Sequence, residues 1–422
     1  MDALFPGVPS VVDWGLGRMR AALAESGDPH RRYRSLHVGG TNGKGSVAAT
    51  WASVLLRRGD RTGLYTSPHL CSFRERIMVD GAPLPASRLL ETATRLRPLA
   101  LDLGMPLFEA CTLLALVVFA EEEVDSACVE VGLGGRLDAT NVIEPEVAAI
   151  TNVALDHREH LGDTLEEIAR EKAGIIKPGV PVATAEGRPA ALSVLQARAR
   201  EVDAPFHRVE PRRHISDLRL GRDGTRFAFR TGAGRSLELR TPLPGAHQAT
   251  NAALAVRALE LLPQPPSAES VQAGVAGVKW PGRGQIRRFG DARFIFDVAH
   301  NRAAAVALAR VLAELAPPRP LVVLAGILAD KDWSRMLPPL VDPADRVVLT
   351  TPASAPPERR WNPRAAAERV GGAVPVEVSR EVGEAVGRAA ALAGSGTVVV
   401  TGSCHTVGDA LRILGASPFG DD

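Results

Sequence analysis

Short apolar runs alternate with stretches of helical periodicity along the first half of the chain. Runs that fit buried strands occupy residues 35–39, 63–66, 126–131, 147–152 and 181–184. Between them, apolar side chains recur every three or four residues, which predicts helices over residues 46–58, 107–120 and 164–173. We expect Asp163 to cap the last of these helices. Strands that alternate with helices are typical of a parallel sheet covered on both faces.

The pattern changes twice in the second half. Residues 206–242 alternate over short segments joined by glycine-containing turns, which predicts a small antiparallel sheet appended to the first domain. An amphipathic helix is expected over residues 248–262, and a Pro-rich surface loop over residues 352–364. After a Gly- and Pro-rich stretch at residues 279–285, alternation resumes, with strands expected at residues 293–298, 320–326, 346–350, 374–378 and 397–401.

These patterns predict an α/β protein of two domains. Residues 1–281 would form the first, which combines a parallel sheet with the small antiparallel one. Residues 282–422 would form a smaller, Rossmann-like, doubly wound domain. A chain of 422 residues is long for one hydrophobic core, and two full domains need no partner to bury their cores, so a monomer is expected.

Composition excludes several classes of partner. The net charge is +2, so nothing favours a nucleic acid or a membrane surface, and only 4% of residues are aromatic. The longest apolar run, residues 110–120, is shorter than the ~20 residues that span a bilayer. Four scattered cysteines and an N-terminal segment without a basic, then apolar, pattern predict a reduced, cytoplasmic protein.

The most informative turn follows the first predicted strand and spans residues 39–46 (GGTNGKGS). Glycines let backbone N–H groups approach phosphates, and the following helix N-terminus adds positive potential. Lys44 would reach the outer phosphates and Ser46 would offer its hydroxyl to Mg²⁺, although Gly45 separates the two, unlike in the usual phosphate-binding motif. The turn predicts a P-loop ATPase-like first domain; the alternative is a glycine-rich turn without a ligand.

Three further ionisable residues follow predicted strands or lie in a helix. Glu130 ends a buried strand, where an unpaired carboxylate is costly, so it either binds a metal ion or pairs with Arg136. His157 lies just past the next strand, and ligands gather at the carboxyl ends of parallel strands. Lys44, Glu130 and His157 should therefore converge, although histidine is an unusual ligand for Mg²⁺. From spacing alone, Lys172 is a solvated lysine at a helix end.

A series of motifs stands in the order found in one known family. The run GTNGKGS at residues 40–46, with its glycine between lysine and serine, resembles the Mur ligase superfamily. The full set resembles its folate branch, the folylpolyglutamate synthases and bifunctional dihydrofolate synthases. The further motifs are TSPHL (66–70), RERI (74–77), EVGLGGRLDATN (130–141), LDH (155–157), EKAGI (171–175), PGRGQ (281–285), FDVAHN (296–301), ADKD (329–332) and TGSCHTV (401–407).

The resemblance implies a role for each matching position. The loop that would hold the ATP phosphates consists of Thr41, Asn42, Gly43, Lys44, Gly45 and Ser46. Further nucleotide contacts would come from Asn251, Arg283 and Asp297. The residues that would hold Mg²⁺, with two ions expected, are Ser46, Ser67, Glu130 and His157. Lys172 would carry a carbamate, which replaces its interpretation as a solvated lysine. The catalytic set would be Lys44, Lys172 and His300.

The resemblance also implies two substrate sites. Dihydropteroate or a reduced folate would bind against Asp13, Pro106, Leu107, Phe108, Glu109, Leu137, Asp138 and Ala139. The incoming L-glutamate would bind Arg76, His300 and Ser403. Asp13 fits a helix N-cap equally well. The chain departs from the common family pattern at Val11, Gly17 and Arg302, and the first two of these bear on the dihydropteroate activity.

The implied reaction joins L-glutamate to the carboxylate of dihydropteroate, of reduced folates or of both, through an acyl phosphate made from ATP. The alternatives are a monofunctional folylpolyglutamate synthase and a catalytically inactive ATP-binding homologue. A peptidoglycan Mur ligase would need an extra domain before the loop at residues 39–46. A P-loop kinase or GTPase would leave the second domain unexplained.

Overall fold

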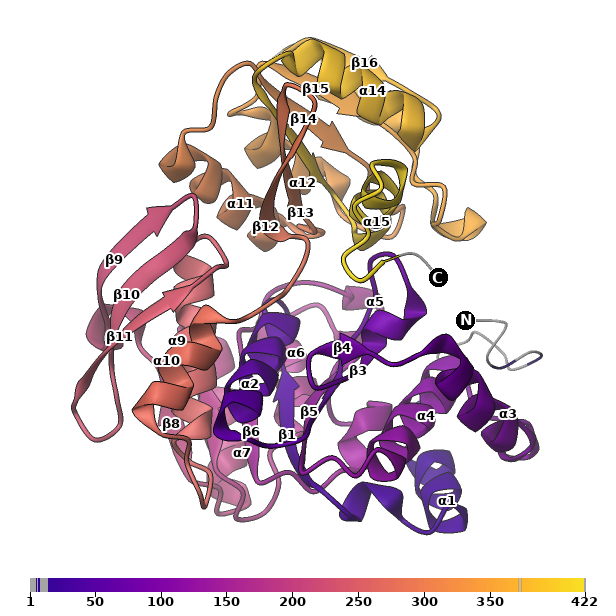
Figure 1. The fold of residues 1–422 in the computed structure, drawn as a ribbon, viewed down its shortest axis with the longest axis vertical. Helices are drawn as coiled ribbons and strands as arrows, with labels where there is room; N and C mark the ends of the chain where they lie inside the picture. Colours follow the sequence, from indigo (N-terminus) through magenta and orange to yellow (C-terminus); the bar gives the residue numbers. More distant parts are fainter. Residues whose placement is uncertain (1–4, 6, 8–13, 371, 373, 421–422) are drawn as a thin grey trace.

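Two large sheets, one below the other in Figure 1, organise the chain, and a small sheet lies beside both. The computed structural model describes all residues except 1–4, 6, 8–13, 371, 373 and 421–422. The N-terminal two thirds form the lower part of this view and the C-terminal third forms the upper part. The predicted α/β fold class is confirmed.

The lower sheet has eight strands in the order β4-β3-β2-β5-β1-β6-β7-β8. Its five parallel pairings run from β2 to β8, whereas β3 and β4 add an antiparallel edge. The strands are β1 (Arg34–Gly39), β2 (Thr62–Tyr65), β3 (Ile77–Val79), β4 (Ala82–Pro83), β5 (Ser126–Glu130), β6 (Val147–Ile150), β7 (Val182–Thr184) and β8 (Phe206–Arg208).

Helices cover both faces of this sheet, as the alternation along its strands requires. In β5, Cys128 packs into the core beneath α2, whereas Ala127 and Val129 face the core beneath α4. The helices of this part are α1 (Gly17–Glu25), α2 (Lys44–Arg58), α3 (Ala86–Asp102), α4 (Leu107–Glu121), α5 (Arg158–Leu161), α6 (Leu165–Ala173), α7 (Pro189–Glu201), α8 (Pro211–His214), α9 (Ala246–Leu259) and α10 (Ala268–Ala276). Three-residue or four-residue 3-10 turns form η1 (Pro29–Arg31), η2 (Phe73–Arg76) and η3 (Ala139–Val142).

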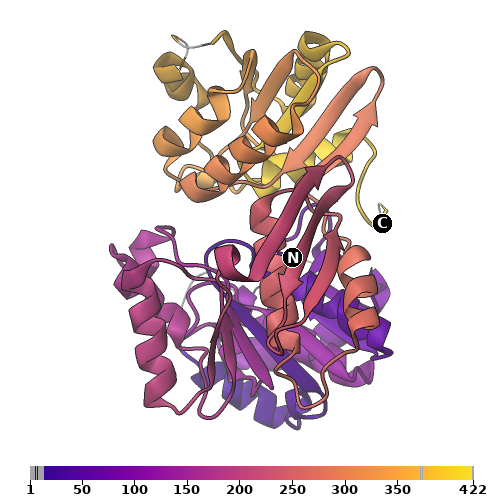
Figure 2. The same cartoon turned by 90° about the vertical axis from the view of Figure 1, so that its left-hand side faces the viewer.

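The small sheet is an antiparallel meander of β9 (Ile215–Gly221), β10 (Gly224–Arg230) and β11 (Ser236–Thr241). Its Phe227 and Phe229 are buried in the same core as α2 and α9, which explains why it packs on the lower part. Figure 2 shows it in front, reaching up toward the upper part. The expected antiparallel sheet is therefore confirmed, except that its first residues form β8, which pairs with β7 in the large sheet.

The upper sheet has the order β12-β13-β17-β14-β15-β16, with only the β12–β13 pairing antiparallel. Its strands are β12 (Arg283–Phe289), β13 (Ala292–Asp297), β14 (Leu321–Ala325), β15 (Arg346–Leu349), β16 (Val376–Val378) and β17 (Thr397–Thr401). Separate hydrophobic clusters cover its two faces. They are built with α11 (Arg302–Leu315), α12 (Trp333–Val341), α13 (Pro363–Val370), α14 (Val382–Ala393) and α15 (Cys404–Ile413).

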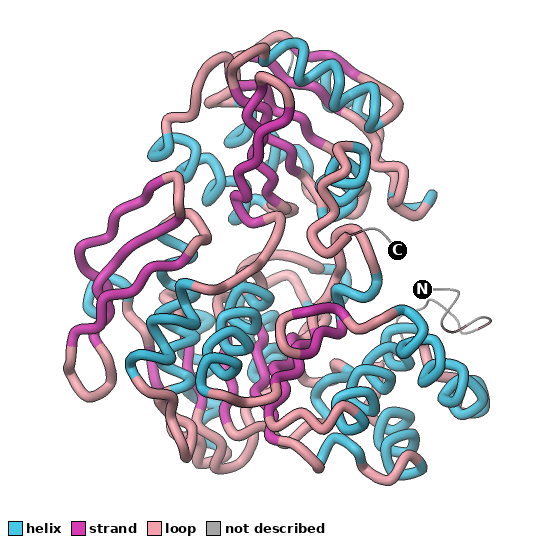
Figure 3. The backbone as a smooth tube through the Cα atoms, in the orientation of Figure 1, coloured by secondary structure: helices cyan, strands magenta, loops and turns pink. Residues whose placement is uncertain are grey.

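One local expectation is wrong, and two stretches contain more regular structure than expected. The cap of α6 is Thr164, not Asp163: its hydroxyl accepts from the Glu167 backbone N–H, and the Glu167 carboxylate accepts from the Thr164 N–H in return. The Gly- and Pro-rich stretch at residues 279–285 runs directly into β12, so the junction is partly a strand. The expected loop at residues 352–364 contains the 3-10 turn η4 (Pro357–Arg359) and the first residues of α13. Figure 3 shows how the loops gather where the two parts face each other.

Among the described residues, no helix is long and apolar enough to cross a bilayer. All four cysteines are free thiols, two of them fully buried.

Candidate active site

The turn between β1 and α2 has the geometry of a phosphate-binding loop. Gly43 adopts a left-handed conformation (φ 89°) at the N-terminus of α2, where a Cβ atom would lie 2.6 Å from the Asn251 amide oxygen. A Cβ atom at Gly45 would lie 2.6 Å from the ring of Trp280. The glycine between Lys44 and Ser46 is therefore explained by packing, because Trp280 from the junction with the upper part lies directly against it.

Polar side chains hold this loop against β6. The Thr41 hydroxyl accepts from the Ala154 N–H at 2.9 Å. The Asn152 side-chain oxygen accepts from the Asn42 N–H, and its side-chain amide donates to the Asn42 carbonyl. Lys44 Nζ donates to the Thr41 carbonyl at 3.3 Å, so its ammonium lies over the loop rather than in solvent. Backbone donors and a lysine thus surround one small volume, as phosphate binding requires.

Two buried oxygen groups, the Glu130 carboxylate and the Ser46 hydroxyl, lie beside the loop. Glu130 is 5% exposed, and burial raises its pKa although the charge of Lys44 opposes that shift. Its carboxylate accepts from the Ser67 N–H at 3.1 Å. The Ser46 hydroxyl is buried without any hydrogen-bond partner. The alternative that Arg136 neutralises Glu130 is excluded, because Arg136 pairs with Glu171 at 2.9 Å.

These groups fit a divalent cation. An unbonded buried hydroxyl and a buried carboxylate are the oxygen ligands that Mg²⁺ prefers. Among the residues that the structure describes, no three His, Cys, Asp or Glu side chains gather closely enough to hold a metal ion by themselves. Ser46, Ser67 and Glu130 would therefore supply only part of a coordination shell, and phosphate oxygens of a nucleotide would complete it.

Lys172 is buried, contrary to the interpretation of a solvated helix-end lysine. It is 3% exposed, and its Nζ donates to the Gly40 carbonyl at 3.0 Å. Burial, followed by the charge of Lys44, lowers the pKa of Lys172 to about 7. A substantial fraction of this amine is therefore neutral, and nucleophilic, near neutral pH.

A buried carboxylate that the sequence analysis did not select, Asp156, joins the two parts. Lys331, from the loop after β14, donates to Asp156 at 2.7 Å, and both side chains are 7% exposed. Asn301 donates to the other carboxylate oxygen at 3.0 Å and exchanges hydrogen bonds with Asn42. Burial alone would raise the pKa of Asp156, but Lys331, with His300 and His157, lowers it well below its usual range. This ion pair holds the upper part against the phosphate loop.

Both predicted site histidines lie at this ion pair. His157 Nε2 lies 3.1 Å from Lys331 Nζ, and His300 Nε2 lies 3.7 Å from an Asp156 oxygen. Burial lowers the pKa of each to about 4. Both imidazoles are therefore neutral at physiological pH. In this arrangement His157 Nε2 is bonded to Lys331, so metal ligation through that nitrogen requires Lys331 to move.

The predicted nucleotide and metal residues share one cavity of about 310 Å³. Asp297 is partly buried there, accepts from the Gly284 and Ala299 N–H groups, and has a pKa that burial raises to about 6. The predicted residues that line the cavity are Thr41, Asn42, Gly43, Lys44, Gly45, Ser46, Ser67, Glu130, His157, Lys172, Asn251, Arg283, Asp297 and His300. The predicted nucleotide and metal residues, which are far apart in the sequence, therefore lie around one cavity.

A second cavity of about 390 Å³ adjoins the first, since both include Ser67, His157 and His300. One wall is largely apolar and comes from the lower part; the other carries Lys331 and Arg359. The predicted substrate residues that line it are Arg76, Pro106, Phe108, Glu109, Leu137, Asp138, Ala139 and Ser403. Leu107 does not line it, because this side chain packs into the core beneath α4. Asp13 lies outside the described residues.

Several of these groups already have partners. Arg18 donates two hydrogen bonds to the Glu109 carboxylate, at 2.8 and 3.1 Å. Ser403 caps α15 by accepting from the Thr406 N–H, which places the helix N-terminus at the cavity. Arg76, 8% exposed, donates to the ring of His69 at 3.0 Å. The cavity thus combines an apolar wall with positive charge and a helix N-terminus, a setting suited to anionic ligands with a flat apolar body.

Comparison with known protein families identifies the architecture. The Mur ligase middle domain matches residues 38–259, and the Mur ligase glutamate ligase domain matches residues 282–404. A dihydrofolate synthase/folylpolyglutamate synthase of Bacillus subtilis is 38% identical over 334 residues, covering 76% of this chain and 77% of its own. The protein of the same name from Escherichia coli is 34% identical over 414 residues, covering 97% and 93%. The chain belongs to the Mur ligase family, in its folylpolyglutamate synthase/dihydrofolate synthase branch. It is an ATP-dependent ligase.

Solved structures of relatives share the ligase's fold across nearly the whole chain. Mycobacterium tuberculosis folylpolyglutamate synthase complexed with ADP superposes with a TM-score of 0.89 at 34% identity, covering 97% of this chain and 96% of its own. Escherichia coli FolC in complex with DHPP and ADP gives 0.85 at 32% identity, covering 98% and 95%. A bifunctional relative with Mn, AMPPNP and L-glutamate bound gives 0.83 at 31% identity, covering 96% and 95%.

We expect the ion pair between Asp156 and Lys331 to contribute measurably to the free energy of unfolding of the ligase. Lys331→Met removes the ammonium and leaves Asp156 buried without its cation. We expect this change to lower the free energy of unfolding by about 3–5 kcal/mol, because an uncompensated charge then stays buried. Urea denaturation followed by tryptophan fluorescence measures the loss.

The matched control is Arg310→Gln, which removes an exposed cation on α11. The double variant Lys331→Met/Asp156→Asn should recover part of the loss. An unfolding free energy for Lys331→Met equal to that of the control would show that the pair does not hold the two parts together.

Proposed function

We propose that the protein ligates L-glutamate to the carboxylate of both dihydropteroate and reduced folates, through an acyl phosphate formed with ATP. The observation that carries this proposal is the junction of the two cavities at Ser67, His157 and His300. A nucleotide in the first cavity would end beside the carboxylate of a substrate in the second. Relatives named for both activities support the same assignment.

The phosphate loop would position the nucleotide. Backbone N–H groups of residues 41–46 and the ammonium of Lys44 would bind its phosphates, and Asn251, Arg283 and Asp297 would contact the remainder. Ser46, Ser67, Glu130 and His157 would hold two Mg²⁺ ions with the phosphate oxygens. When bound, Mg²⁺ supplies charge neutralisation for phosphoryl transfer.

Lys172 would act as a carbamate. A carbamate forms when a neutral amine attacks CO₂ and loses a proton, and the lowered pKa of Lys172 supplies the neutral amine. The product is an anion, which removes the repulsion between Lys172 and Lys44 and adds an acceptor beside the metal residues. Lysine shifts its pKa readily when it is buried, which makes the neutral amine available.

The apolar wall of the second cavity would take the pterin and aminobenzoyl rings. Phe108 offers a flat ring, and Leu137, Pro106 and Ala139 add apolar surface to this wall. Asp138 fixes the adjoining turn by accepting from the Leu133 and Thr140 N–H groups. Glu109 would accept hydrogen bonds from the pterin, oriented by Arg18.

The opposite wall would bind L-glutamate. Arg76, Lys331 and Arg359 carry positive charge around it, and Ser403 with the N-terminus of α15 adds donors suited to a carboxylate. His300, neutral because of burial, would accept a proton from the attacking amine. This arrangement orients the amine toward the junction of the two cavities.

The reaction would then proceed in two steps. The substrate carboxylate attacks the terminal phosphorus of ATP, and ADP leaves as the acyl phosphate forms. The amine of L-glutamate attacks the acyl carbon, loses a proton and expels phosphate, which leaves an amide. Positioning by the two walls and charge neutralisation by Lys44 would account for most of the rate enhancement.

Closure of two domains would shield the acyl phosphate from water. We place the domain boundary at residues 281/282, where Trp280 packs on the phosphate loop and β12 begins. Arg283 at this junction would report nucleotide binding to both parts. We also propose that the protein is a monomer, because each sheet buries its own core. We propose that it works in the cytoplasm.

The second candidate function is folylpolyglutamate synthesis alone. It is favoured by the two departures from the family pattern at Val11 and Gly17, which flank the residue proposed to contact dihydropteroate. ADP release separates the two functions. In the presence of Mg·ATP and L-glutamate, we expect ADP release when dihydropteroate is the acceptor and also when a reduced folate is the acceptor.

Release with the reduced folate alone would contradict the bifunctional assignment while leaving the ligase chemistry in place. Omission of L-glutamate is the control in each case, because sustained turnover requires the amine.

Lys172→Ala tests the carbamate. We expect the variant to lose about 10²–10³ in kcat, the size found when one preorganised charge-stabilising group is removed. A small added carboxylate such as acetate should restore part of the activity, since it can occupy the space of the carbamate. Initial rates of ADP release with and without acetate measure both effects.

Lys279→Ala, which removes an exposed lysine outside the two active-site cavities, is the matched control for rescue. Full activity of Lys172→Ala without acetate would contradict a catalytic role for the carbamate.

A further inference from the structure

A third cavity, of about 540 Å³, lies at the amino ends of the strands of the large lower sheet, whereas the phosphate loop lies at their carboxyl ends. The phosphate loop follows the carboxyl end of β1, whereas this cavity is lined by segments that precede strands: η1 before β1, Glu144 before β6, and residues 177–180 before β7. Helix α1 supplies the remaining wall. Its volume lies in the range of small-molecule sites, roughly 300–1,000 Å³.

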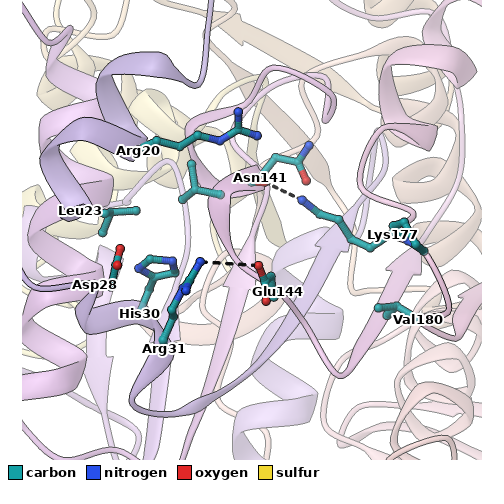
Figure 4. Close-up of a pocket in the computed structure, with 11 residues that line it drawn as sticks. Arg20, Leu23, Asp28, His30, Arg31, Asn141, Glu144, Lys177 and Val180 are labelled. Carbon is teal, nitrogen blue, oxygen red and sulfur yellow. Dashed lines mark hydrogen bonds and ion pairs between the residues drawn. The ribbon is translucent and has the colours of Figure 1, made fainter.

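Two cations face this cavity without a carboxylate partner. Figure 4 shows Arg20 and Lys177 reaching toward each other from α1 and from the loop before β7. Within the described part of the chain, neither forms an ion pair; Lys177 Nζ donates only to the Asn141 carbonyl, at 2.7 Å. Burial, followed by the charge of Arg20, lowers the pKa of Lys177. An anion between them would relieve this repulsion.

The rest of the lining suits an organic ligand rather than a bare ion. Leu23, Val142 and Val180 provide apolar surface, and the acidic Asp28 and Glu144 can accept hydrogen bonds from hydroxyl groups. His30 lines the same cavity, is 9% exposed, and its Nδ1 is buried without a partner. Within the described part of the chain this ring nitrogen has no partner, so it is available for one hydrogen bond with a ligand in the cavity.

We propose that this cavity binds a phosphate monoester whose body carries hydroxyl groups, with the phosphoryl group between Arg20 and Lys177. Two unpaired cations match the two negative charges of a phosphate monoester, and its three oxygens can accept from a guanidinium and an ammonium together. The hydroxyl groups would face Asp28 and Glu144, and the carbon skeleton would lie on the apolar surface. This ligand is distinct from the nucleotide at the active site.

The cavity is connected to the proposed pterin site through a single short segment. Lys177 bonds the carbonyl of Asn141, whose backbone N–H donates to the Asp138 carbonyl at 2.8 Å. Asp138 lines the pterin cavity. A ligand that draws Lys177 toward its phosphoryl group would weaken its bond to Asn141 and alter the turn at residues 137–141. Binding should therefore change the KM for the pterin substrate more than kcat; this consequence rests on the proposed function.

Binding is tested with the full chain saturated with Mg·AMPPNP, so that the nucleotide site is filled. Isothermal titration with ribose 5-phosphate should show one site per chain. Arg20→Gln and Lys177→Met should each raise Kd at least tenfold, whereas Arg310→Gln should leave it unchanged. Arg20 and Arg310 are both exposed helix residues, so neither substitution threatens folding. Inorganic phosphate should bind more weakly at the same site.

Three outcomes would overturn the proposal: no saturable binding of ribose 5-phosphate, equal binding in all variants, or tighter binding of tri-γ-glutamate than of ribose 5-phosphate. The last would assign the cavity to carboxylates instead. These titrations require no turnover, so a failure of the proposed ligase function leaves their interpretation unchanged.

Discussion

The buried ion pair between Asp156 and Lys331 is the contact on which the active site depends. Asp156 follows β6 of the lower sheet, and Lys331 follows β14 of the upper one, so the pair joins two separate cores. Asn301 reinforces it by binding both Asp156 and Asn42 of the phosphate loop. Without such a contact, the cations of the upper part would not face the apolar wall of the lower part.

The same site concentrates charge that burial makes costly. Glu130, Asp156, Lys44 and Lys172 lie around one cavity, and burial shifts the pKa values of Glu130 and Lys172 toward their neutral forms. Removing charges from water costs free energy that a protein recovers only when partners are complete. We infer that the missing partners are the phosphates and cations of the substrate complex, so the site trades stability for preorganised binding.

The sequence predicted much of the fold because local signals agreed with the tertiary arrangement. Buried strands such as β5 and β14 are continuous apolar runs, and the phosphate loop has a spacing set by backbone chemistry. The antiparallel partner β12 was missed because its glycines and charged residues resemble a linker. Phe206 was assigned to the wrong sheet, since a three-residue strand carries no signal for its partner.

The site residues also divide into those that the sequence pattern could bring together and those that it could not. Ser46, Glu130 and His157 follow strands of one sheet, and parallel strands bring their carboxyl ends together whatever the sequence distance. Asp156 and Lys331 are 175 residues apart and belong to different sheets, so no periodicity relates them. The motifs that contain them were visible, but the contact was not. The burial of Lys172 depends on packing against Gly40, which spacing alone does not report.

Isotope transfer shows whether an acyl phosphate links ATP consumption to amide formation. The pterin substrate would be prepared with ¹⁸O in both carboxylate oxygens and turned over with unlabelled ATP and L-glutamate. We expect one ¹⁸O atom in each phosphate released, because the carboxylate oxygen that attacks phosphorus leaves with it. Released phosphate without ¹⁸O would show that the carboxylate is never phosphorylated and would contradict the mechanism.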